Sequence, residues 1–101
     1  MDTINIISFT LSVAKYTTAT PEELAELISL TRKLHTVNER LCMEDNVERL
    51  LKKQERLMAR IYDLANKIGA SAVCGSDPRY ATVKLYFEGM SDYMDGISVP
   101  Y

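Results

Sequence analysis

The spacing of apolar side chains in two long segments constrains the fold more than any other feature of the chain. Both segments place apolar residues alternately three and four positions apart, which puts them on one face of an α-helix. In the first segment, residues 21–42, they are Leu27, Leu30, Leu34, Val37 and Leu41. In the second, residues 46–68, they are Val47, Leu50, Leu57, Ile61, Leu64 and Ile68, with Gln54 in the same series. The sequence therefore predicts two long helices, and the short linker 43–45 allows only an antiparallel return.

Residues that favour helix ends agree with these boundaries. Thr20-Pro21 followed by Glu23 has the composition of a capping box with proline at the first helical position. Asp45 offers a cap for the second helix, and Gly69 favours its end because glycine readily adopts the left-handed conformation. We expect residues 70–76 to form a loop.

A third helix is predicted over residues 78–95, after the helix-start signal Asp77-Pro78. Its apolar positions again step by three and four, through Tyr80, Val83, Phe87, Met90, Met94 and Ile97. This stripe is expected to pack against the helical hairpin.

The segment 4–14 fits two structures. Ile7, Phe9, Leu11 and Val13 alternate with polar residues, as in a half-buried strand. Its only partner strand would be the short segment 97–99, so a helix is favoured. The sequence then predicts one all-α domain over residues 1–101, in which the hairpin extends to a three- or four-helix bundle with coiled-coil packing.

Composition and charge narrow the class of protein. The chain has 101 residues and a net charge of −2, which argues against a surface devoted to nucleic acid or anionic lipid. Two cysteines, Cys42 and Cys74, without CxxC spacing are typical of reduced thiols. The start of the chain lacks a basic n-region, and polar residues interrupt the apolar stretch 4–14. We therefore expect a cytoplasmic protein that does not associate with membranes.

The sequence contains no recognisable set of catalytic residues. His35, Glu39 and Cys42 fall on one helical face, and Cys74 could approach them in the fold. A zinc site needs three or four ligands in a characteristic spacing, however, and a histidine beside an acid on a helix is usually a solvated pair. We expect no enzyme activity, no metal and no cofactor.

Two surfaces are candidates for binding. An aromatic group on the predicted third helix and the tail is a candidate partner-binding surface: Leu85, Tyr86, Tyr93 and Tyr101. A basic stripe on the second long helix is interrupted only by Asp63: Arg49, Lys53, Arg56, Arg60 and Lys67. Residues 32–67 carry nine basic and six acidic side chains, a net charge of +3.

These observations favour a non-enzymatic interaction protein, a homodimer or a subunit of a larger complex. Its expected role is that of a regulator or inhibitor that binds or occludes a partner complex, such as a phage or plasmid protein that disables a host complex. The expectation depends on the heptad face, which is wider than a hairpin with short helices is expected to cover. The alternative is a helical protein that binds nucleic acid through the basic stripe.

Overall fold

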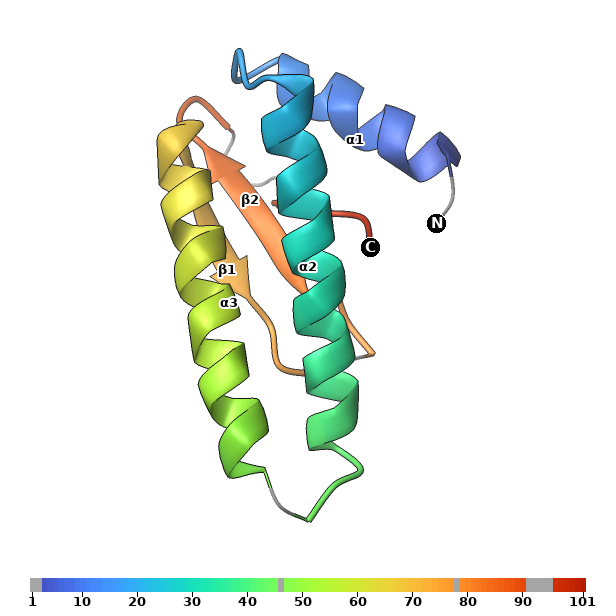
Figure 1. The fold of residues 1–101 in the computed structure, drawn as a ribbon. Coiled ribbons are helices and arrows are strands. Elements are labelled where there is room, and N and C mark those ends of the chain that lie inside the picture. Colours follow the sequence, from blue (N-terminus) through green and yellow to red (C-terminus); the bar gives the residue numbers. More distant parts are fainter. Residues whose placement is uncertain (1–2, 46, 78, 91–95) are drawn as a thin grey trace.

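The computed structural model describes residues 3–45, 47–77, 79–90 and 96–101. Three helices precede three strands, in the order α1 (Thr3–Ala14), α2 (Pro21–Leu41), α3 (Glu48–Lys67), β1 (Ala70–Cys74), β2 (Val83–Phe87) and β3 (Ile97–Ser98) (Figure 1). The strands form one antiparallel sheet in the order β1-β2-β3. The fold class is thus α+β, and the prediction of an all-α bundle is wrong.

Both long helices and the N-terminal helix form as predicted. α2 begins with the expected capping box: the Thr20 side chain accepts a hydrogen bond from the Glu23 N–H, and the Thr20 N–H donates to the Glu23 carboxylate. α3 begins at Glu48 after Val47, whose side chain makes no capping bond, so the prediction of an Asp45 cap is wrong. Gly69, with φ of +84°, follows the end of α3 as predicted.

The predicted third helix does not exist among the described residues. Residues 83–87 form the central strand instead, because Val83, Leu85 and Phe87 alternate with Lys84 and Tyr86 and only the alternate set is buried. The predicted loop 70–76 contains β1, which pairs with β2 from Ala70 opposite Phe87 to Cys74 opposite Val83. Pairing with β1, a strand of mostly small residues, therefore stabilises residues 83–87 as a strand. The helical spacing of their apolar residues is coincidental.

The sheet lies on one side of the α2–α3 hairpin, and one hydrophobic core joins the two layers (Figure 1). α3 packs along β1, and its buried side chains include Ile61, Leu64 and Ala65. The heptad face of α3 is thus covered within the chain, although Leu51 beside it remains 48% exposed. The heptad series consequently gives no reason to expect a partner outside it, contrary to the sequence-based argument.

A polar network ties the hairpin to the loop after β1. The Gln54 side-chain amide on α3 donates to Asn38 Oδ1 on α2 at 2.8 Å, and Asn38 Nδ2 donates to the Gly75 carbonyl at 2.9 Å. Asn38 is buried, yet its amide oxygen and nitrogen both have partners. Gln54, the polar member of the heptad series, therefore has a structural role in the hairpin.

α1 lies across the start of α2, at the end of the molecule away from the hairpin loop (Figure 1). Phe9 and Val13 are its buried residues, and the Tyr16 ring beyond it stacks on Phe87 with centroids 5.7 Å apart. Among the described residues, no helix combines the length and apolarity that a bilayer crossing requires.

Candidate functional site

The predicted aromatic surface is not assembled as expected. Leu85 is completely buried in the core, while Tyr86 points to the opposite face of β2 and its ring covers Gly96. Tyr101 stacks on His35 with ring centroids 4.1 Å apart. Tyr93 lies outside the described residues. Leu85 is thus a core residue, and Tyr86 and Tyr101 are the described members that remain partly exposed.

Both ring nitrogens of His35 and one face of its ring contact other side chains. Its Nδ1 lies 3.1 Å from the hydroxyl of the buried Thr82, and its Nε2 lies 3.0 Å from Glu39 Oε1. The ring face is covered by Tyr101. His35 therefore fixes the C-terminal segment against α2, and neither ring nitrogen is left for a metal. Among the described residues, no cluster of three potential metal ligands occurs.

The thiol of Cys74 is in a setting that disfavours reactivity. Burial raises its pKa, and the neighbouring Tyr62 hydroxyl offsets this only in part. Because the thiolate is the nucleophile, a raised pKa lowers the reactive fraction at neutral pH. Cys74 ends β1, and no described helix follows it whose N-terminus would lower the pKa of the thiol.

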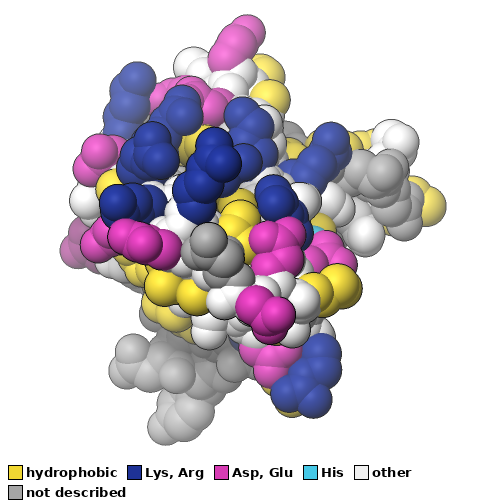
Figure 2. All heavy atoms as spheres, turned by 60° about the horizontal axis from the view of Figure 1, so that its bottom comes forward, with side chains coloured by type: hydrophobic (Ala, Val, Ile, Leu, Met, Phe, Trp, Pro, Cys, Tyr) yellow, Lys and Arg dark blue, Asp and Glu magenta, His cyan; other side chains and the backbone are white. Residues whose placement is uncertain are grey.

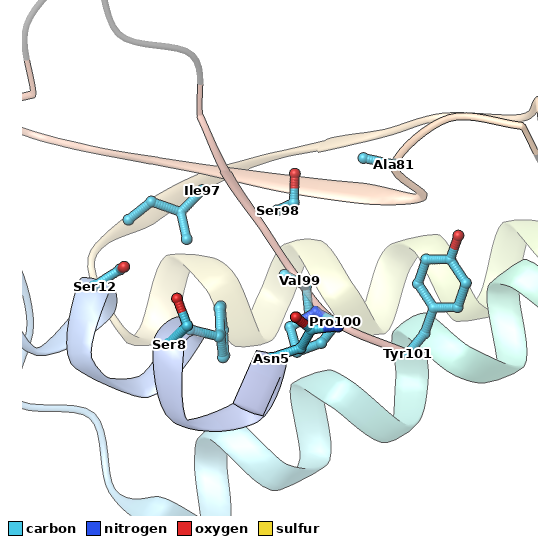
Figure 3. A pocket seen from close by; sticks show the side chains of 10 residues that line it. Asn5, Ser8, Ser12, Ala81, Ile97, Ser98, Val99, Pro100 and Tyr101 are labelled. Atoms are coloured by element: carbon cyan, nitrogen blue, oxygen red, sulfur yellow. The ribbon is translucent and has the colours of Figure 1, made fainter. Parts of the chain in front are cut away.

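A hollow of about 660 Å³ separates α1 from the C-terminal segment. α1 contributes Asn5, Ser8 and Ser12, and the opposite wall is formed by residues 97–101 (Figure 3). Among the described residues, its lining combines apolar side chains with hydroxyl and amide groups and has no carboxylate, amine or imidazole. The hollow therefore lacks an acid–base pair.

α1 faces the core with Phe9 and Val13 and has the polar side chains Asn5, Ser8 and Ser12 along the hollow, while a second apolar side faces outward. Ile4, Ile7 and Leu11 follow helical spacing, and their exposed fractions are 72%, 54% and 64%. We call these three residues the α1 stripe. α1 contains no charged residue, and its exposed polar side chains are the uncharged Thr3, Asn5, Ser8 and Thr10. A helix that is apolar on most of its circumference is normally buried.

The sequence contained a signal for the α1 stripe. Ile4, Ile7 and Leu11 have helical spacing, and in a bundle this spacing predicts a buried face. The buried residues are instead Phe9 and Val13, with Ile6 packed beside them. The absence of charge over Thr3–Ala14 is the signal that distinguishes this helix from an ordinary surface helix.

The basic stripe on α3 is joined by basic residues of α2. Two adjoining hollows lie along the outer side of the hairpin and share Lys53 and Arg56. One is also lined by Lys33 and the other by Arg40 and Arg49. Figure 2 shows Lys and Arg side chains gathered on this side of the molecule. We call Lys33, Arg40, Arg49, Lys53 and Arg56 the cationic groove.

The other two predicted members of the stripe are partly neutralised. Lys67 lies 3.6 Å from Glu23, and Arg60 lies 3.8 Å from Glu26. The contacts hold both acids on α2 beside α3, and hydrogen bonding to the Thr20 backbone, with Lys67 nearby, lowers the pKa of Glu23. The structure thus divides the predicted stripe into a paired end and an unpaired end.

The two α2 members of the groove were missed from the sequence. Glu26, Lys33 and Arg40 are seven residues apart, so they share one edge of α2. The antiparallel return places that edge beside the α3 stripe, which a helix-by-helix inspection does not reveal.

Comparison of the chain with protein-family models, with curated proteins and with solved structures gives no match.

Proposed function

We propose that the chain is a non-enzymatic interaction protein that binds another protein through the α1 stripe. The observation that carries this proposal is an uncharged helix with Ile4, Ile7 and Leu11 turned toward solvent. Covering each such side chain is worth about 1.5–3 kcal/mol.

The chemistry of α1 specifies the surface that fits it. A charged partner surface would lose hydration against α1 and gain no ion pair in return. The matching surface is itself apolar and uncharged, and a second copy of α1 meets this requirement. A two-fold contact of α1 with its copy would bury both stripes in one isologous interface. The proposed complex is therefore a homodimer through α1.

Light scattering coupled to size exclusion tests this proposal over a wide range of protein concentration. We expect the chain to have the molar mass of a dimer, which falls toward that of a monomer on dilution. Ile7→Glu is expected to be monomeric throughout, because the two-fold axis would bring two glutamates together in an apolar contact. Circular dichroism should show an unchanged fold, since Ile7 is exposed.

Ala59→Glu provides the matched control, because it adds the same charge at an exposed position of α3. This variant should dimerise like the unmodified chain. A chain that is monomeric at every concentration, or a dimer unaffected by Ile7→Glu, would contradict the proposal.

A further inference from the structure

Along the outer side of the hairpin, charged residues form ion pairs at one end and a cluster of like charges at the other. Near the start of α2, acids on α2 face bases on α3, and both pairs lie within 4 Å. Toward the hairpin loop, Lys33 and Arg40 on α2 line the same hollows as Arg49, Lys53 and Arg56 on α3. The hairpin thus brings like charges together at its loop end.

Acidic side chains compensate this cluster only slightly. Glu44 accepts a hydrogen bond from Arg40 at 3.0 Å and lines the same hollow. Among the described residues, Lys33, Arg49, Lys53 and Arg56 form no ion pair. Like charges at this spacing weaken a helix pair rather than stabilise it. Folding stability therefore does not explain why the groove carries these basic residues.

The residues at the floor of the groove indicate whether its anionic partner is an acidic protein or a nucleic acid. Leu50 and Leu57 lie beneath the cations and are each only 6% exposed, and no aromatic residue lines either hollow. A protein partner obtains most of its binding energy from apolar and aromatic anchors in pockets. Nucleic acid obtains it from cations placed against phosphates. The groove offers cations without anchors, which fits nucleic acid.

The length of the groove also suits a phosphate backbone. Arg49 and Arg56 are seven residues apart, so the basic side chains of the groove extend over about 10 Å of α3. One strand of a duplex presents a phosphate about every 3.4 Å along its axis, so about three phosphates of one strand lie over the α3 side of the groove. Stacking residues, which single-strand binding requires, are absent from the lining of both hollows. We propose that the cationic groove binds the phosphate backbone of duplex nucleic acid, independently of sequence.

Fluorescence anisotropy with a short labelled DNA duplex tests this inference. We expect binding at about 50 mM salt that weakens steeply as salt is added, with a log–log slope of about −4 for four to five neutralised phosphates. Lys53→Glu/Arg56→Glu should reduce the affinity at least 100-fold. Lys53→Gln/Arg56→Gln should reduce it less and make the slope shallower by about 2.

The control has the same change in net charge at positions away from the groove. Lys15→Glu/Lys84→Glu replaces two basic residues outside both hollows, so this variant should bind like the unmodified chain. Equal loss of affinity in the control and groove variants would overturn the inference, as would an absence of duplex binding at low salt. Tight binding of a polyglutamate peptide without duplex binding would also overturn it, in favour of an acidic protein.

These outcomes are separate from those of the dimer experiment. The α1 stripe and the hairpin loop lie at opposite ends of the molecule (Figure 1). Ile7→Glu should therefore retain the groove in each protomer, and the groove variants should retain the dimer.

Discussion

A single buried polar residue, Asn38, connects three parts of the fold through its hydrogen bonds. Asn38 is 1% exposed and joins α2 to both α3 and the loop after β1. The sequence shows one polar residue, Gln54, in the apolar series of α3, but it contains no sign of the Asn38 partner. Asn38 sits beside the apolar series of α2 rather than in it, and only the tertiary contact reveals its role.

Replacing Asn38 by alanine should therefore destabilise the protein by about 2–3 kcal/mol, because it leaves the Gly75 carbonyl and the Gln54 amide without partners. Thr36→Ala on the same helix should change the stability by less than about 0.5 kcal/mol, since Thr36 is exposed and bonds only to its own helix. Urea denaturation measures both. Equal stabilities of the two variants would mean that the network contributes little.

At the scale of elements, local spacing predicted the helices and failed for the sheet. α2 and α3 were predictable because each repeats its apolar period over about five turns and carries end signals such as the Thr20 cap. Residues 83–87 satisfy both a helical and a strand period within five positions. Pairing with β1 decides between them, and β1 itself, Ala70–Cys74, has small side chains that resemble a loop.

Leu85 distinguishes the two interpretations experimentally. In a helix it would lie off the apolar stripe, whereas on β2 it is completely buried. Leu85→Ala is expected to cost about 2–5 kcal/mol of unfolding free energy in thermal or urea denaturation. Tyr86→Ala, on the outer face of the same strand, should cost clearly less. A near-neutral Leu85→Ala would contradict the sheet.

For the whole molecule, the question is which apolar surface remains after the chain has covered its own helices. The sheet covers α3, so the heptad faces that suggested a partner are satisfied internally. Among the residues that the structure describes, an exposed apolar stripe lies on α1, where a charge-free sequence turns Ile4, Ile7 and Leu11 outward. The prediction of an interaction surface thus stays a proposal, but its location moves from the predicted third helix to α1.

A disulfide cross-link at α1 tests this claim most directly. Ile7 is the middle residue of the stripe, so a two-fold contact places it nearest to its own copy. In a chain with Cys42→Ser and Cys74→Ala, we expect Ile7→Cys to form an interchain disulfide under mild oxidation, since this bond requires Cα atoms within about 7 Å. Ala59→Cys in the same background should form no interchain disulfide, because Ala59 lies on α3, away from the proposed contact. Failure of Ile7→Cys to cross-link above the level of Ala59→Cys would contradict the proposed α1 contact.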